Sequence, residues 1–407
     1  MNIGSPQSDT FKRREGIYPG QDKNRYSGTS RNITMIVNKL TIENFRNYQK
    51  ETLEPGSGFN LLVGKNAQGK SNCIEALYLL GLGRPYRTSR EEDALPPGAG
   101  YSRVAGEFTE GEISFSLEII WDNHSSGVLR KIIRHNKTPV SRLSDFIGLA
   151  PMVLLTVDDL DIVRGDPQLR RRFLDLLCSR VNPSYVVDLR EYKKVLEARN
   201  AWLKIPPGKR DPRLGEVYLD RLVFLGAGVM LSRMDIIKQL REEFESLYRE
   251  IFRGEPPAVS YRSTALKPGK SGQEDVRDSF RKTLGSLKRL EDRRAHTMAG
   301  PHRDDLEMIS YNGPLKKFAS LGEIRTAAAV LKLAEAVVLS RKLQREPVIL
   351  MDDCLNEFDP DRVRLFLNHL AGNRQVIYAA TCIPRYFDGI DGISIFQVNE
   401  GRITPCS

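Results

Sequence analysis

One glycine-rich segment of the chain has the composition of a phosphate-binding loop. Its residues are Gly64, Lys65, Asn66, Ala67, Gln68, Gly69, Lys70 and Ser71, which match the pattern G-x-x-x-x-G-K-[ST]. An apolar strand precedes the segment and an apolar helix follows it, as this motif requires. Backbone N–H groups would close around the phosphates at the helix N-terminus, Lys70 would bridge the β- and γ-phosphates, and the Ser71 hydroxyl would bind Mg²⁺. The alternative is a chance match in a glycine turn.

Two carboxylates follow a second apolar strand, Val348 to Met351. A phosphate-binding loop needs a carboxylate on a neighbouring strand to hold the metal through Ser71 and water. We expect Asp352 to be this metal residue, and Asp353 to polarise an attacking water as a general base. Acidic residues after a buried strand are often helix caps, which is the alternative. Together the two segments predict ATP and Mg²⁺ as cofactors, with Lys70, Asp352 and Asp353 as the catalytic residues.

A third segment begins a helix with Ser320 and carries Gly322 and Glu323. Ser at the N-cap with Glu three residues later is a capping box, and this alone would explain the pattern. The functional alternative is that the exposed Ser and the small Gly let the helix N-terminus present its N–H groups to a γ-phosphate bound by another subunit.

The elements that must position these residues form an α/β pattern that is split in sequence. Strands are expected at Ile36 to Glu43 and Phe59 to Val63, and a helix at Ser71 to Leu80. Alternating runs between residues 103 and 135 predict an antiparallel sheet beside the loop. After about Gly300 the α/β pattern resumes with a helix from Gly322 to Arg341, strands at Val348 to Met351 and Gln375 to Ala380, and a final hairpin around Asn399-Glu400-Gly401.

Helical periodicity between the two α/β parts predicts an inserted helical lobe. We therefore expect a disordered extension at residues 1–34, the first part of the α/β domain at 35–160, the helical lobe at 161–295 and the second part of the α/β domain at 296–407.

The predicted lobe is basic, with 13 basic and 7 acidic residues between Arg164 and Glu216. A face that contacts DNA phosphates is one interpretation, and an ordinary solvated face is the other. The candidate DNA-binding residues are Arg170, Arg171, Arg172, Lys193 and Lys194.

Composition sets the limits for this interpretation. The formal charge of +10 over 407 residues permits a nucleic-acid partner without requiring one. The five cysteines are scattered and show no C-x-x-C spacing, so neither a disulfide framework nor a zinc site is indicated. Because no apolar run approaches the length of a membrane span, we expect no membrane association and a cytoplasmic location.

The phosphate-binding loop, the Ser320 helix, the paired acids and the segment Asn356-Glu357-Phe358-Asp359 occur in the order found in ABC/SMC-type ATPases. Within that class the chain resembles the RecF family along almost all of residues 35 to 405. The blocks that carry this resemblance are Leu40 to Tyr48, Gly81 to Thr88, Gly165 to Asp175, Tyr192 to Asn200 and Gly300 to Leu306.

This resemblance implies an ABC/SMC-type ATPase head with an antiparallel β subdomain and an inserted helical lobe. Arg46 and Asn47 would lie against the nucleotide. Two heads would enclose two ATP molecules, with Ser320, Gly322, Glu323 and Asp359 facing the partner's nucleotide. It further implies an ATP-dependent homodimer on double-stranded or gapped DNA, and RecR, RecO and RecA as partners.

The implied function is recombination mediation in DNA repair and replication-fork recovery, by a weak, DNA-stimulated ATPase that promotes RecA loading. The Ser-Leu-Gly-Glu-Ile-Arg segment at 320–325 departs from the S-x-G-Q-Q form that is more usual in the family, as do Asn356 and Phe358. These departures leave turnover and dimer affinity open. The alternatives are a DNA-binding scaffold with ATP as a structural ligand, or another ABC-type ATPase.

Overall fold

A computed structural model describes residues 32–407 except Ser89, 124–128, 267–271, 356–357, 372–373, 388–391 and Ser407. Most of the predicted disordered extension therefore lies outside the described residues, as do Asn356 and Glu357. The first strand begins at Ile33, slightly earlier than expected. Residues Ile33–Ser407 form one unit.

The central sheet combines strands from both ends of the chain, in the order β16-β15-β3-β14-β13-β8. Its members are β3 (Phe59–Val63), β8 (Met152–Thr156), β13 (Val348–Asp352), β14 (Val376–Ala380), β15 (Ser394–Asn399) and β16 (Arg402–Cys406). All pairs are parallel except β15 with β16. The inner strands are buried along nearly their whole length, which explains why they read as continuous apolar runs. The α/β domain is thus split in sequence, as expected.

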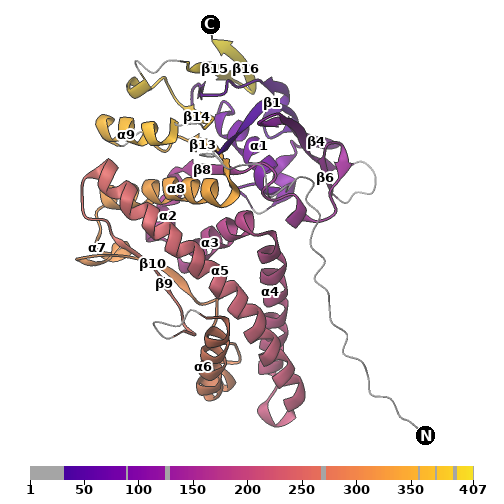
Figure 1. The fold of residues 1–407 in the computed structure, drawn as a ribbon. Helices are drawn as coiled ribbons and strands as arrows, with labels where there is room; N and C mark the ends of the chain where they lie inside the picture. Colours follow the sequence, from indigo (N-terminus) through magenta and orange to yellow (C-terminus); the bar gives the residue numbers. More distant parts are fainter. Residues whose placement is uncertain are drawn as a thin grey trace. The chain divides into compact units, whose positions relative to one another are not determined.

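A second sheet lies beside the first, and helix α1 (Lys70–Leu82) shares a buried apolar core with both (Figure 1). The sheet contains β1 (Ile33–Phe45), β2 (Tyr48–Leu53), β4 (Tyr101–Glu110), β5 (Ile113–Asp122), β6 (Arg130–His135), β7 (Thr138–Pro139) and β12 (Arg345–Glu346). Apart from the short parallel pair of β1 and β12, its pairings are antiparallel. The predicted antiparallel sheet is confirmed.

Long helices follow the first part of the α/β domain (Figure 1). The remaining helices are α2 (Leu160–Arg164), α3 (Pro167–Val181), α4 (Pro183–Lys204), α5 (Pro212–Phe252), α6 (Gln273–Arg294), α7 (Leu315–Phe318), α8 (Leu321–Leu343) and α9 (Pro360–Ala371). No described helix combines the length and the apolar character needed to cross a membrane.

Helix α5 connects two apolar cores, so the helical lobe is not separate at the level of packing. Leu222 and Leu225, near its start, pack in a small core with α4 and α6, whereas Phe244 and Leu247 join the large core that contains α8. The region is also not purely helical. Strand β9 (Ala258–Arg262) lies within it and forms a small sheet with β10 (Asp305–Ser310) and β11 (Gly313–Pro314) of the following segment, which the sequence pattern did not reveal.

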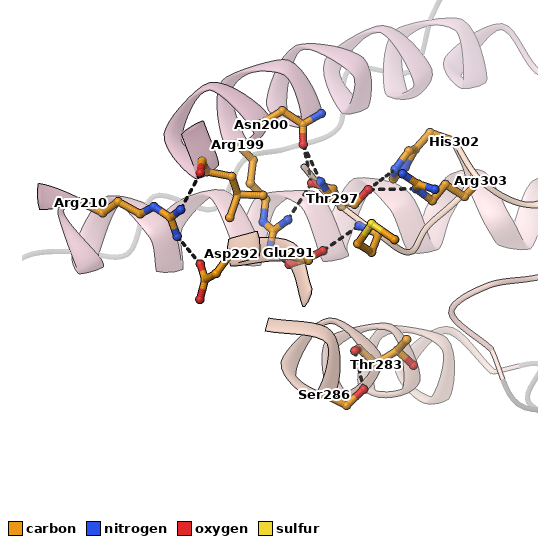
Figure 2. Close-up of polar contacts among 12 residues, drawn as sticks. Arg199, Asn200, Arg210, Thr283, Ser286, Glu291, Asp292, Thr297, His302 and Arg303 are labelled. Carbon is orange, nitrogen blue, oxygen red and sulfur yellow. Dashed lines mark hydrogen bonds and ion pairs between the residues drawn. The ribbon is translucent and has the colours of Figure 1, made fainter. Parts of the chain in front are cut away.

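The segment after α6 is attached to the lobe by buried polar contacts (Figure 2). Arg199 donates to the Thr297 hydroxyl at 2.7 Å and to the Glu291 carboxylate at 2.6 Å. His302 lies 2.6 Å from the Tyr192 hydroxyl and 3.2 Å from the Thr297 carbonyl. Burial lowers the pKa of His302 to about 4, so the ring is neutral at ordinary pH. These contacts support a structural role for His302.

Helix α3 carries three charged side chains that attach it to three other elements. Arg170 forms a bidentate ion pair with Asp305 of β10, in which its Nε and Nη2 atoms lie 2.7 and 2.9 Å from the two carboxylate oxygens. Asp175 accepts from Arg233 of α5 at 2.7 Å. Arg180 pairs with Glu335 of α8, which also pairs with Lys332. Burial opposes the charge of Glu335, but Lys332 and Arg180 outweigh this and lower its pKa.

We expect Glu335→Gln to lower the free energy of unfolding by about 3 kcal/mol or more, because Arg180 and Lys332 would remain buried without their carboxylate. Urea denaturation followed by circular dichroism measures this loss. Glu54→Gln, which breaks the exposed pair with Lys39, is the control and should leave the midpoint unchanged. Equal midpoints for the two variants would contradict the role given to Glu335.

Candidate functional site

The predicted phosphate-binding loop connects β3 to α1 at the carboxyl end of the central sheet. Lys70 is 5% exposed, and its ammonium donates to the carbonyls of Gly64 at 2.7 Å and Lys65 at 2.8 Å. Burial lowers the pKa of Lys70, and the nearby carboxylates of Asp353 and Asp352 act in the opposite direction. The lysine is therefore held inside the curve of the loop with two carboxylates in its surroundings.

The N-terminus of α1 has no side chain that competes for its backbone donors. Its N-cap is Gly69 with φ of 123°, no side chain caps it, and no acidic residue lies in its first turn. Ala67 also has a positive φ, of 63°. Uncapped N–H groups at the end of a helix, preceded by a loop of this shape, suit a phosphate group.

Two turns outside the motif support the loop. From the β1–β2 turn, the Asn47 amide donates to the Gln68 carbonyl at 3.0 Å and the Tyr48 hydroxyl donates to the Gly69 carbonyl at 3.0 Å. From the β15–β16 turn, the N–H of Gly401 donates to the Gln68 carbonyl at 2.9 Å, and the N–H of Glu400 donates to the Gln68 side chain at 2.7 Å.

The β15–β16 turn fits this place closely. Glu400 and Gly401 both have positive φ, which is the geometry of a tight hairpin turn. A Cβ on Gly401 would stand 2.5 Å from the Asn47 carbonyl oxygen, and a Cβ on Gly64 would stand 2.2 Å from the Val398 carbonyl oxygen. The hairpin therefore lies directly against the loop.

Asp352 and Ser71, predicted to share the metal, lie together. The Ser71 hydroxyl donates to Asp352 Oδ1 at 2.8 Å, and the Tyr86 hydroxyl donates to Asp352 Oδ2 at 2.8 Å. Burial, together with the charge of Asp352, raises the pKa of Tyr86, so its hydroxyl stays protonated and remains a donor.

These oxygen atoms fit Mg²⁺ as a cofactor. Within the described part of the chain, no three His, Cys, Asp or Glu side chains are grouped so that they could hold a metal by themselves. One hydroxyl and one carboxylate are the usual protein share of a Mg²⁺ site whose other ligands are phosphate oxygens and water. The donor set therefore matches a metal that arrives with a nucleotide.

Asp353 follows the end of β13 in a left-handed conformation, with φ of 50°, and its N–H donates to the Ala379 carbonyl at 3.1 Å. The hydrogen bond keeps the backbone of Asp353 against β14, and the left-handed conformation changes the direction of the chain directly after Asp352. Asp353 also lines a cavity of 260 Å³ together with Thr156, Arg325 and Phe358. The cavity thus lies between the residues after β13 and the first turns of α8.

Arg46 points to the side of α1. Its guanidinium contacts the fully buried Glu75 of that helix at 3.0 Å and donates to the Asp93 carbonyl at 2.7 Å. Asn47, in contrast, touches the loop itself and also accepts from Asn72 at 2.8 Å. Of this predicted pair, Asn47 is the residue for which the described part of the chain shows a hydrogen bond to the phosphate-binding loop.

Similarity to known proteins agrees with this geometry. The family model of the RecF/RecN/SMC N terminal domain matches residues 36–383. The DNA replication and repair protein RecF of Geobacillus kaustophilus is 32% identical over 377 residues, which cover 92% of this chain and 100% of that protein. The chain belongs to the RecF family. The RecF protein of Geobacillus thermodenitrificans is similar at 31% identity over the same shares of both chains.

Solved structures show the same relationship in three dimensions. A structure described as the recombination mediator protein RecF with ATP in the RecFOR pathway aligns with a TM-score of 0.84 at 26% identity, covering 94% of this chain and 100% of that one. An Smc head domain from Pyrococcus furiosus aligns with a TM-score of 0.52 at 17% identity, which shows the fold alone. The fold is that of an ABC/SMC-type ATPase head, as the RecF resemblance implied.

The residues that the RecF resemblance assigns to a partner's nucleotide are exposed. The Ser320 hydroxyl accepts from the N–H of Glu323, and the Glu323 carboxylate accepts from the N–H of Ser320 at 2.7 Å, so the predicted capping box is present. A Cβ on Gly322 would meet nothing within 4 Å. Among the described residues, no hydrogen bond or ion pair joins these three to the chain's own phosphate-binding loop.

Asp359 is exposed at the start of α9 and accepts from the N–H of Asp361 at 3.0 Å. It therefore caps the N-terminus of α9.

The predicted DNA-binding residues need one correction. Arg170 is 3% exposed and paired with Asp305, so it is not available to a phosphate. Arg171 is half-buried and donates to the Asp304 carbonyl at 3.0 Å. Arg172, Lys193 and Lys194 are exposed, and Lys194 contacts Glu191 at 3.0 Å. A run of three arginines in a helix points to different faces, which is why the run alone misled.

Sequence reasoning missed two contributors to the site. The sequence did predict the Asn399-Glu400-Gly401 hairpin, but nothing in it indicates that this turn meets the loop more than 300 residues earlier. Tyr86 was noticed only as part of a RecF-like block. A tyrosine that follows the α1 helix carries no sign that its hydroxyl reaches a carboxylate on β13.

We expect Gly401→Ala to weaken ATP binding, because the added methyl group would collide with the Asn47 carbonyl and displace the turn that supports the loop. The matched control is Gly392→Ala, which has the same φ, 73° against 74°, but open space around its Cβ. Both variants should lose about 1 kcal/mol of stability from the left-handed conformation. Gly401→Ala should lose more than this because its methyl group meets Asn47, and it alone should lose nucleotide affinity. Fluorescent-nucleotide titration and thermal melting measure the two effects. Equal affinities would show that the hairpin does not support the loop.

Proposed function

We propose that this chain is an ATP-dependent, DNA-binding recombination mediator that acts in DNA repair and replication-fork recovery. The observation that carries the proposal is the contact of Ser71 with Asp352 beside an uncapped α1 N-terminus, in a chain of the RecF family. Relatives described as RecF proteins of DNA replication and repair support the biological setting.

In this proposal the residues Gly64 to Ser71, with Asn47, bind ATP. The N–H groups of the loop and of the first turn of α1 hold the phosphates, and Lys70 moves from the loop carbonyls to the β- and γ-phosphates. Ser71 and Asp352 would hold Mg²⁺, which supplies positive charge for the phosphate oxygens. Asp353 would orient the attacking water. Arg46, which is held by its ion pair with Glu75, would lie beside the nucleotide.

The second part of the proposal is an ATP-dependent homodimer. Ser320, Gly322, Glu323 and Asp359 of one subunit would face the nucleotide of the other. Their exposure supports this arrangement, as does the finding that, within the described residues, no hydrogen bond joins them to the chain's own loop. The capping box would then serve two purposes. It stabilises the first turn of α8, and it leaves the remaining N–H groups of that turn free to bind an anion.

The third part is contact with double-stranded or gapped DNA through Arg172, Lys193 and Lys194, with RecR, RecO and RecA as partners by family resemblance. Slow hydrolysis, stimulated by DNA, would release the dimer and allow another round of RecA loading. A scaffold that uses ATP only as a structural ligand is the alternative function.

Mixing two inactive variants tests the dimer directly. Lys70→Ala removes the loop lysine, and Ser320→Asp keeps a good N-cap but opposes a phosphate with a negative charge. Each variant alone should lose DNA-stimulated turnover. In a symmetric two-site dimer, an equal mixture should recover about a quarter of the wild-type turnover, because half of the dimers carry one intact composite site.

Ser320→Asn is the control for the cap, since Asn caps helices as well as Asp without its charge. If the mixture stays inactive while the wild type forms ATP-dependent dimers, each site is built within one subunit. If Lys70→Ala is defective in turnover but retains every DNA-binding property of the wild type, the scaffold function replaces the ATPase function.

We expect Lys193→Ala to weaken DNA binding and to reduce the slope of log K against log salt by about 0.9, the value for one phosphate contact on duplex DNA. Lys193 is exposed, and no ion pair is seen for it within the described residues. Lys50→Ala, at an exposed position of β2, is the matched control and should leave the slope unchanged. Filter binding of gapped duplexes at several salt concentrations gives both slopes. Identical slopes would remove α4 from the DNA-binding surface.

A further inference from the structure

The Asp352 carboxylate is held from two sides by neutral hydroxyl groups. Ser71 donates to Oδ1 and Tyr86 donates to Oδ2, each at 2.8 Å. Ser71 belongs to the phosphate-binding loop, so its contact is explained by the nucleotide site. The Tyr86 contact is not, because Tyr86 comes from the segment after α1.

The local structure directs Tyr86 to this position. Helix α1 ends at Gly83, which has φ of 68° and donates its N–H to the Leu79 carbonyl at 2.7 Å. This left-handed cap reverses the chain, and the buried Pro85 restricts the backbone directly before Tyr86. The Tyr86 ring then meets Tyr78 of α1 edge to face, with centroids 5.5 Å apart and planes at 78°.

Packing of the ring and contact of the hydroxyl are therefore separate features of Tyr86. Tyr78 fixes where the ring lies, and the fixed ring leaves the hydroxyl at hydrogen-bonding distance from one atom, Asp352 Oδ2. A phenylalanine would keep the first feature and lose the second.

We propose that Tyr86 is a positioning residue that holds the Asp352 carboxylate in the orientation in which Asp352 and Ser71 take up Mg²⁺ with the nucleotide. This inference rests on the proposed ATP site. Mg²⁺ tolerates little departure from octahedral geometry, so a carboxylate that serves it gains from being fixed before the metal arrives. Hydrogen bonds from outside the ligand set commonly supply this orientation.

The test is Tyr86→Phe, compared with Tyr78→Phe as the matched control. Each variant removes one hydroxyl from the same ring pair, and only Tyr86→Phe removes a donor to Asp352. Affinity for a fluorescent ATP analogue is measured with Mg²⁺ and again with EDTA. We expect Tyr86→Phe to lower the affinity about tenfold with Mg²⁺ and to leave the affinity in EDTA unchanged, while Tyr78→Phe changes neither.

A second measurement repeats Tyr86→Phe in the Asp352→Asn background. Because Tyr86 acts through the carboxylate, its removal should cause no further loss of Mg²⁺-dependent affinity there. Thermal melting of every variant checks that the fold is intact.

Three outcomes would overturn the proposal. Tyr86→Phe could match Tyr78→Phe in Mg²⁺, it could lose affinity equally in EDTA, or its loss could persist unchanged in the Asp352→Asn background. A wild-type protein whose affinity does not respond to Mg²⁺ is a different result, because it would contradict the proposed metal site itself rather than the role of Tyr86.

Discussion

The ion pairs of three charged side chains on α3 are the interaction on which the arrangement of β10, α5 and α8 depends. Arg170, Asp175 and Arg180 are five residues apart, and they reach β10, α5 and α8 respectively. Because a buried charge without its partner is far more costly than a lost apolar contact, each pair restricts its two elements to one relative position. Helix α3 therefore fixes the positions of the lobe, of the small β9–β11 sheet and of α8 relative to one another.

This arrangement connects the proposed DNA-binding face with the proposed dimer contact. Lys193 lies on α4, which packs against α5 in the lobe, and α5 continues into the large core beside α8. The chain itself supplies a second connection, since β10 leads through α7 into α8. The lobe and the Ser320 end of α8 are thus connected both by a continuous helix and by a strand that is ion-paired to α3.

Much of the fold and the centre of the site could be predicted from sequence, because local rules determine them. The apolar run before Gly64 and the one before Asp352 are typical of buried parallel strands, and the Ser320 and Glu323 spacing defines a capping box. Contacts between distant segments were not predictable. Nothing in the sequence indicates that Asp305 pairs with Arg170. Arg170 was therefore predicted to be a surface residue. Strand β9 was missed because five residues between prolines and a polar loop show little periodicity.

The position of β3 in the central sheet has a consequence for the synthesis of the protein. The strand that carries the phosphate-binding loop hydrogen-bonds only to β14 and β15 among the described strands, and the turn after β15 supports the loop. All of these partners lie in the last 32 residues of the chain. During synthesis on the ribosome, the nucleotide-binding loop is therefore made long before the strands that hold it in place. Chains that end before β14 would lack both strands that flank β3.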